Sequence, residues 1–348
     1  MNSNDLILVT GASGFVGKWC VVRALERGYR VRGTIRSAEK AKQVRDTILA
    51  LLGQEPASRL DLVTADLLDD AGWTEAMRGV KAVLHVAAAI RGDEPKDQSV
   101  VIRPAVEGTA RVMRFAHAAG IGRVILTSSI ATVGYGHGQT SGKRVYDETH
   151  FTNLDGMTWK WAYCIGNTKA EQAAWEYARV NGMELTTIHP GMIFGPALDT
   201  DASISLLAVS GLLDGSTPAM PNMGLSVSDV RDVADLHIAA LEQPEAAGQR
   251  YLATSRYLRF REIADILRPV YPDRNVTQKT VPDWLMRTLA YFGGPIRQVI
   301  NDIGNEKHFD GRKGEALLGR PFRSAEEATL SAAESVVRLN MLKPRKAR

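Results

Sequence analysis

The chain has 348 residues, of which 45% are hydrophobic, and its formal net charge is +4 at pH 7 with acidic and basic side chains mixed along the sequence. This length and composition suffice to bury a large core, and they predict a globular protein of one sizeable domain or two lobes. No segment reaches the roughly 18 apolar residues of a membrane span, and the first residues lack a signal-peptide pattern, so we expect a cytoplasmic protein.

The sequence offers little for disulfide, metal or nucleic-acid chemistry. Its two cysteines, Cys20 and Cys164, each fall inside a predicted helix and have no partner at metal-ligand spacing. The compact basic run KPRKAR at 343–348 is interpreted as a solvated end of the chain. We therefore expect no metal site, no nucleic-acid partner and no membrane partner.

Apolar segments of strand length alternate with segments of helical spacing in the first half of the chain. These strand candidates are LILVTG at 6–11, YRVRGTI at 29–35, LDLVTAD at 60–66, AVLHVAA at 82–88, RVILTSS at 123–129 and ELTTIHP at 184–190. Strands joined by helices read as a parallel, doubly wound sheet, because parallel neighbours need helical crossovers. The predicted fold class is α/β, with a Rossmann-type sheet.

The pattern changes after about residue 195, where longer helical segments such as DVADLHIAALEQ follow one another. We predict a Rossmann domain over residues 1–195 that binds the cofactor. Residues 196–348 are predicted to form a smaller, mainly α lobe that binds substrate, with some strands returning to the main sheet. The cleft would lie between the two.

The stretch VTGASGFVGKW joins the first strand to a helix and carries Gly11, Gly14 and Gly17 at G-x-x-G-x-x-G spacing. Glycines in this context allow a tight turn and let the backbone approach a pyrophosphate that faces the helix N-terminus. A glycine-rich turn without ligand is the alternative. We assign the whole loop to the cofactor, including Ser13, Phe15 and Val16.

The end of the second strand, where nicotinamide cofactors are usually distinguished, reads TIRSAEKAK. Arg36, Ser37 and Lys40 present cations and a hydroxyl where an acid would hold the ribose of NAD, and a guanidinium suits a 2′-phosphate. The expected cofactor is therefore NADP(H). The alternative is that Lys40 and Lys42 only form a solvated helix face.

Two further strand ends are predicted to contact the cofactor. Asp66, followed by Leu67, ends the third strand and would accept from the adenine amino group or, alternatively, cap the next helix. Ala87 and Ala88 follow the fourth strand, where small side chains let the cofactor ribose lie against the backbone or serve packing alone.

The fifth strand ends in hydroxyl side chains that include Ser128 and Ser129, and Tyr163 follows near the start of a long helix. Together these features resemble the extended short-chain dehydrogenase/reductase superfamily, most closely its dihydroflavonol reductase-like branch. The motifs that carry the resemblance are VTGASGFVGKW, VRGTIRS, ADLLD, HVAAA, PAVEGT, VILTSS, AEQAAW, HPGMIFGP, SVSDVRDVADLHI and LLGRPFRSAEEATL.

The resemblance implies roles for individual residues. Ser129 would bind the substrate carbonyl and Tyr163 would donate a proton to it, while Pro190, Gly191 and Ile193 would lie beside the nicotinamide. The partner would be a small carbonyl or alcohol substrate, and a homodimer is implied only at the level of the family.

The chain departs from this family at residue 167, where asparagine stands in place of the lysine that binds the nicotinamide ribose and lowers the pKa of the tyrosine. Asn167 shares a helix face with Tyr163, whereas Lys169 is rotated about 240° away at roughly 100° per residue. An amide can hold ribose hydroxyls, but it has no charge to stabilise tyrosinate. We count Ser129, Tyr163 and Asn167 as the catalytic set.

These observations predict NADPH-dependent reduction of a carbonyl, such as an aldehyde, ketone or flavonoid-like molecule, or the reverse oxidation. The alternatives are a reductase with altered chemistry, an NADP(H)-binding sensor or scaffold without catalysis, and an NAD-dependent sugar-nucleotide epimerase or dehydratase. Apolar side chains that could line the cleft, with core packing as the alternative for most of them, are Ile90, Tyr135, Trp159, Met192, Phe194 and Met223.

Overall fold

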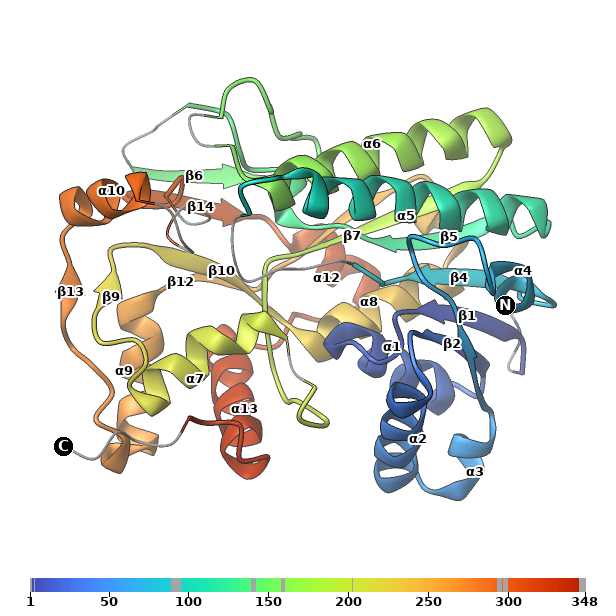
Figure 1. The fold of residues 1–348 in the computed structure, drawn as a ribbon, viewed down its shortest axis with the longest axis horizontal. Helices are drawn as coiled ribbons and strands as arrows, with labels where there is room; N and C mark the ends of the chain where they lie inside the picture. Colours follow the sequence, from blue (N-terminus) through green and yellow to red (C-terminus); the bar gives the residue numbers. More distant parts are fainter. Residues whose placement is uncertain are drawn as a thin grey trace.

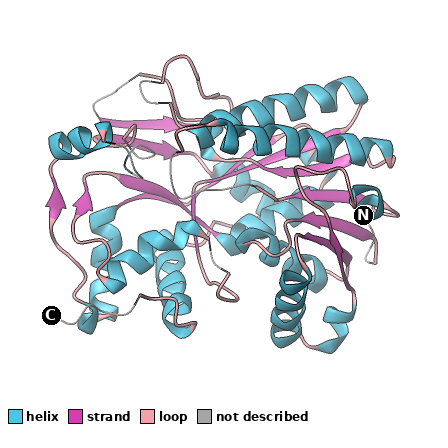
Figure 2. Cartoon of the chain, viewed as in Figure 1, coloured by secondary structure: helices cyan, strands magenta, loops and turns pink. Residues whose placement is uncertain are grey.

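The computed structural model describes residues 2, 4–88, 95–138, 142–157, 160–201, 203–292, 296 and 300–343. Ile90 and Trp159 of the expected cleft, and most of the basic C-terminal run, lie outside these residues. A central parallel sheet is flanked by helices on both faces, which Figure 2 shows in colour by element type. The α/β prediction is confirmed.

The main sheet has seven strands in the order β11-β7-β5-β4-β1-β2-β3, and all neighbours are parallel. The strands are β1 (Leu6–Thr10), β2 (Arg30–Ile35), β3 (Leu60–Thr64), β4 (Ala82–His85), β5 (Arg123–Thr127), β7 (Glu184–Pro190) and β11 (Arg250–Ala253). The strand order reverses between β1 and β4, and ligands of such sheets bind at the carboxyl ends beside this point.

Helices α5 and α6 lie side by side on one face of the sheet, and α1 packs against α8 on the other (Figure 1). The helices of this part are α1 (Phe15–Glu26), α2 (Ala38–Leu52), α3 (Gln54–Ser58), α4 (Trp73–Met77), α5 (Ser99–Ala118), α6 (Ala162–Asn181), α8 (Val230–Glu242) and the 3-10 turn η1 (Ile130–Thr132). The buried cysteines, Cys20 and Cys164, lie in α1 and α6, as the sequence predicts.

Successive side chains of a strand point to opposite faces of the sheet, and in β1 the side chains on both faces are apolar. In β1, Ile7 and Val9 belong to the core beneath α1 and α8, whereas Leu8 between them belongs to the core beneath α5 and α6. All three side chains are fully buried. A strand that is apolar at every position can bury all its side chains only when helices cover both faces of the sheet.

Apart from β6, the remaining elements come from the second half of the chain, residues 192–338. The short strands are β6 (Gly142–Tyr146), β8 (Met192–Phe194), β9 (Met220–Pro221), β10 (Gly224–Asp229), β12 (Arg256–Arg259), β13 (Thr280–Val281) and β14 (Asn305–Phe309). The helices and turns are η2 (Ile204–Leu206), α7 (Leu207–Asp214), η3 (Pro244–Ala246), α9 (Phe260–Val270), η4 (Pro272–Arg274), α10 (Asp283–Tyr291), α12 (Arg312–Leu318) and α13 (Ala325–Arg338).

The two halves of the chain interleave. Strand β11 and helix α8 come from the second half but belong to the main sheet and its covering layer. Strand β6 comes from the first half and pairs with β14 near the C-terminus. The division at residue 195 therefore stays a prediction. Among the described helices, none combines the length and apolar character needed to cross a membrane.

Candidate active site and cofactor cleft

The turn between β1 and α1 has the geometry of a phosphate cradle. Gly11 has φ +66°, and a Cβ there would lie 2.9 Å from the Cα of Ala87. A Cβ on Gly17 would lie 2.1 Å from the carbonyl oxygen of Gly11. Gly14 precedes the first residue of α1, and no side chain caps the helix there. Its first backbone N–H groups are therefore available to an anion.

The other assigned residues of this loop divide into two kinds. Ser13 and Val16 are half-buried at the turn, whereas Phe15 is buried in the core between α1 and the sheet. Phe15 therefore serves the loop through its backbone N–H at the helix start and anchors it through its ring.

A buried polar pair, which sequence reasoning missed, joins this loop to the end of β4. The Thr10 hydroxyl oxygen accepts hydrogen bonds from the N–H groups of Val86 and Ala87, each at 3.0 Å, so its own proton is left for Nδ1 of His85 at 2.8 Å. Burial lowers the pKa of His85 to about 4, and the ring is neutral. The Thr10–His85 pair holds Ala87 against Gly11. Ala87 and Gly11 come from segments that are far apart in the chain.

The three residues assigned to the cofactor phosphate differ in exposure and in the partners of their side chains. Arg36 is exposed, and no acidic partner for it occurs in the described parts of the chain. Ser37 caps α2 by accepting from the Lys40 backbone N–H at 3.3 Å. The Lys40 ammonium is paired with Asp201 at 2.7 Å, so Arg36 is the cation left uncompensated at this strand end.

Asp66 lies half-buried just beyond β3 and accepts from the backbone N–H of Leu68 at 2.8 Å. Helix α4 is capped by Gly72, so the alternative that Asp66 is the N-cap of the next helix is wrong. Instead, the Asp66 carbonyl oxygen accepts from the Trp73 indole at 2.8 Å. Its carboxylate stays at the sheet edge where the sequence analysis expects adenine.

A pocket of about 500 Å³, open to solvent, lies where β4, β5, α5 and α6 meet. It brings together residues that the sequence analysis assigned separately, namely Leu67, Ala87, Ala88, Tyr163 and Asn167. Ser128 and Glu171 also line it. Among the lining residues that the structure describes, Glu171 is the charged side chain, and none is a Lys or Arg.

Tyr163 is the second residue of α6 and is half-buried. Burial raises the pKa of its phenol above the usual value, and a hydrogen bond with Ser129 acts in the opposite direction. The Ser129 oxygen accepts from the N–H of Ala131 at 3.1 Å, which leaves the serine proton for the phenol or for a substrate oxygen. The serine and tyrosine are therefore in contact.

Asn167 and Lys169 point in different directions. The amide nitrogen of Asn167 donates to the Tyr163 carbonyl oxygen of its own helix at 2.8 Å, and the residue lines the pocket. Lys169 is exposed and does not line the pocket. Within the described lining of this cleft, no lysine or arginine stands beside Tyr163 and Asn167.

Glu171, one turn beyond Asn167 on the same helix face, anchors a buried network that sequence reasoning missed. Its carboxylate accepts from the Ser128 hydroxyl at 2.5 Å and from Nε of Arg250 at 3.0 Å. His189 lies 3.6 Å away. The four-residue spacing of positions 163, 167 and 171 could have indicated Glu171 from the sequence. No local sequence pattern indicates Arg250.

The network is charged at neutral pH. Burial by itself raises the pKa of the Glu171 carboxyl, but His189, Arg250 and Ser128 outweigh it, and the pKa falls below its usual value. Burial also lowers the pKa of His189 to about 4, so Arg250 is the cation that balances Glu171. An ionised Glu171 orients Ser128, the neighbour of Ser129.

The assigned residues after β7 lie at a strand junction. Pro190 ends β7, and Ile193 lies in β8. Gly191 between them donates its N–H to the Ser228 hydroxyl at 2.8 Å, and a Cβ there would lie 2.0 Å from the Ser226 carbonyl oxygen. Of the residues expected at the cleft, Phe194 and Met223 are instead buried in the core.

The glycine cradle, the small alanines and the uncompensated Arg36 fit a dinucleotide that carries a phosphate. No cluster of three or more metal-ligating His, Cys, Asp or Glu side chains occurs within the described residues.

Comparison with known proteins identifies the family. The model of the NAD dependent epimerase/dehydratase family matches residues 7–253. The chain is 38% identical over 279 residues to cinnamoyl-CoA reductase 1 of Petunia hybrida, covering 80% of each chain. It is 35% identical over 280 residues to dihydroflavonol 4-reductase of Zea mays, covering 78% of this chain and 76% of that one.

Among solved structures, the fold is similar to the yeast methylglyoxal/isovaleraldehyde reductase Gre2 complexed with NADPH. The TM-score is 0.77 at 24% identity, and the alignment covers 97% of this chain and 99% of that one. The predicted resemblance is confirmed. The chain belongs to the NAD dependent epimerase/dehydratase family and, within it, to the dihydroflavonol reductase-like extended short-chain dehydrogenases/reductases.

Proposed function

We propose that this chain reduces the carbonyl group of a small molecule to an alcohol with NADPH. It is an oxidoreductase of its family, and its cofactor is NADP(H). The observation that supports the proposed chemistry best is the contact between Ser129 and Tyr163 beside the cofactor cleft. A hydroxyl that polarises an oxygen and a phenol that protonates it are the two groups that carbonyl reduction requires from the protein.

Each group of the protein would have its own role in the reaction. Backbone N–H groups at the start of α1 would hold the pyrophosphate, and the exposed Arg36 would pair with the 2′-phosphate. When bound, NADPH supplies the hydride. Ser129 donates a hydrogen bond to the carbonyl oxygen, and Tyr163 gives that oxygen its phenolic proton as the alcohol forms. Asn167 contributes its amide oxygen as an acceptor for a ribose hydroxyl.

The electrostatics of the cleft favour reduction over oxidation. Burial raises the pKa of Tyr163, Glu171 is the charged residue of the lining, and no lysine stands at 167 to stabilise tyrosinate. A neutral phenol is the form that donates a proton to a nascent alkoxide. The reverse oxidation needs tyrosinate, which this site makes scarce at neutral pH.

The test is NADPH oxidation by the purified protein across a panel of aldehydes, aryl ketones and flavonoid-like ketones. We expect turnover with NADPH, and faster turnover with NADPH than with NADH. Binding of NADPH without turnover of any carbonyl would instead support a sensor or scaffold. The cofactor that copurifies with the protein tests the other alternative, because a sugar-nucleotide epimerase or dehydratase would retain NAD.

A further inference from the structure

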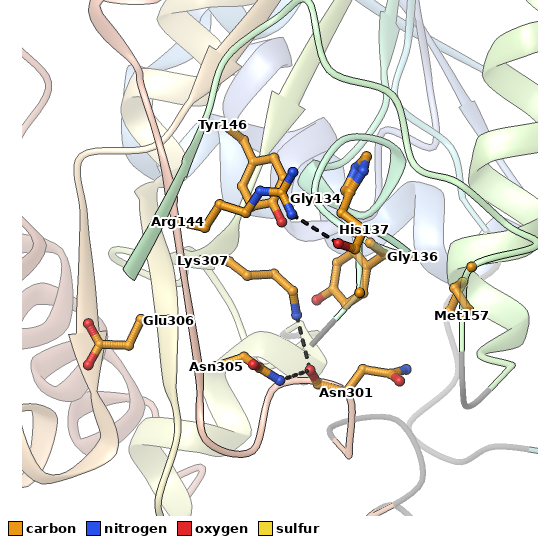
Figure 3. Close-up of a pocket in the computed structure, with 13 residues that line it drawn as sticks. Gly134, Gly136, His137, Arg144, Tyr146, Met157, Asn301, Asn305, Glu306 and Lys307 are labelled. Atoms are coloured by element: carbon orange, nitrogen blue, oxygen red, sulfur yellow. Dashed lines mark hydrogen bonds between the residues drawn. The ribbon is translucent and has the colours of Figure 1, made fainter. Parts of the chain in front are cut away.

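A second pocket lies beyond the reactive serine and is built from segments that the cofactor does not use. It has an empty volume of about 520 Å³ that opens to solvent. The loop 134–138, strand β6, residues 156–157 and the segment 301–307 line it, as Figure 3 shows. The loop 134–138 directly follows η1, which Ser129 caps. The pocket is thus lined by the loop that follows Ser129 in the chain.

Aromatic side chains connect this pocket to Tyr163. The ring of Trp161 lies 5.2 Å from the ring of Tyr163 and 5.5 Å from that of Tyr135, and Tyr135 lines the pocket. The buried Nε1–H of Trp161 has no hydrogen-bond partner among the described residues. A buried donor without a partner costs free energy, and an acceptor on a bound ligand would remove that cost.

Two cations stand next to each other on the strands of the pocket. The register of β6 and β14 places Arg144 opposite Lys307, and both side chains reach into the pocket (Figure 3). Asp302 pairs with Lys307 and accepts from the Tyr135 hydroxyl at 3.2 Å. Asp302 therefore balances Lys307 and makes no ion pair with Arg144. Like charges that face each other across paired strands are unfavourable unless a further anion balances them.

Arg144 is the charge that remains unbalanced. The side chain is half-buried, stacks over the Tyr146 ring at 5.2 Å and donates to the His137 carbonyl oxygen at 3.0 Å. No carboxylate pairs with it in the parts of the chain that the structure describes. Glu306, which also lines the pocket, pairs with Arg259 and lies apart from the other side chains in Figure 3.

We propose that this pocket binds an oxyanionic group of the carbonyl substrate, with Arg144 as its ion partner. The inference rests on the proposed reductase function and specifies its substrate class. Two successive contacts between aromatic rings lead from Tyr163 to the pocket. A substrate whose carbonyl group lies at Tyr163 must therefore carry its carboxylate several bonds away from that carbonyl. The class is therefore oxo acids with a spacer, and 2-oxo acids, whose two groups are adjacent, cannot reach both sites.

The test compares 5-oxo-5-phenylpentanoate with its methyl ester, which has the same carbonyl and spacer but no charge. For the wild-type enzyme with NADPH, we expect kcat/KM to favour the acid. In Arg144→Met, kcat/KM for the acid should fall about 10- to 100-fold, the range for a hydrogen bond to a charged group, while the value for the ester stays within about threefold. Arg144→Lys should restore part of the preference.

Lys143→Met is the matched control, because it removes the same charge from an exposed neighbour on the same strand that does not line the pocket. It should leave the preference for the acid intact. Equal kcat/KM for acid and ester in the wild type, or equal losses in both variants, would overturn the inference while the reductase function stands. If the wild type turns over neither compound nor any other carbonyl, the proposed function fails. In that event, NADPH-dependent binding of the acid by calorimetry, lost in Arg144→Met alone, would still support the anion pocket.

Discussion

Asn167 is the residue whose identity bears most directly on how this site handles protons. Its amide donates to the Tyr163 backbone carbonyl of its own helix, so this donor is not directed at the phenol oxygen. The pKa of Tyr163 is raised by burial with no cation among the residues of the cleft to oppose it. The consequence is a phenol that stays protonated at neutral pH, so tyrosinate, the form that alcohol oxidation needs, is scarce.

Asn167→Lys should therefore change oxidation more than reduction. In the wild type, alcohol oxidation should increase with pH up to and beyond the usual phenol value of about 10, whereas reduction should be flat through neutral pH. The new ammonium should move the oxidation profile about two to three pH units lower. The pH dependence of kcat in both directions checks this, and an unchanged oxidation profile in the variant would contradict it.

Arg36 should decide the preference for NADPH over NADH. Arg36→Ser should lower kcat/KM for NADPH about 10- to 100-fold, because a charge-assisted contact to the 2′-phosphate is lost, and should leave NADH nearly unchanged. Lys42→Ser is the control, since Lys42 is exposed and paired with Asp46. Equal effects of the two substitutions would show that the discrimination lies elsewhere.

At the scale of elements, the packing of α5 against α6 sets the position of Tyr163. Gly166 lies at their contact, and a Cβ there would be 3.2 Å from the Cα of Ile102 and 3.3 Å from the Cβ of Ala105. The close approach of two helices that cover one face of the sheet thus depends on one missing side chain. A larger residue at this position therefore requires Ile102 or Ala105 to shift.

Gly166→Val should cost about 1–3 kcal/mol of unfolding free energy, as overpacking typically does, and should also lower turnover because α6 carries Tyr163 and Asn167. Ala173→Val places the same β-branched side chain on the exposed side of α6 and should cost only a few tenths of a kcal/mol. Urea denaturation of the two variants measures the difference. Equal costs would show that the helices can separate freely.

At the scale of the whole molecule, one hydrophobic core runs through both halves of the chain, from Ile7 in β1 to Val336 in α13. Ion pairs reinforce this union, since the nearly buried Lys18 of α1 pairs with Asp199 and Lys40 of α2 pairs with Asp201. The substrate side of the molecule is therefore attached to the cofactor side by core packing and by charge.

We accordingly expect the protein to unfold in one cooperative transition, because the largest core is built from both halves and neither half can keep it alone. Near-UV and far-UV circular dichroism followed in urea should give coincident curves. Two separated transitions would show that residues 1–195 and 196–348 are independent units. NADPH should move the single transition to higher urea concentration, since it binds the folded state.

The sequence by itself determined six of the seven strands of the main sheet and the glycine cradle, because local spacing encodes them, and it missed β11. The Ser129, Tyr163 and Asn167 set comes from the family resemblance and stays a prediction. Only the tertiary structure decided which distant groups meet. The Thr10–His85 pair, the Glu171–Arg250 network and the adjacent Arg144 and Lys307 each join segments far apart in the chain. Their contacts follow from strand order and register, which a local pattern does not carry.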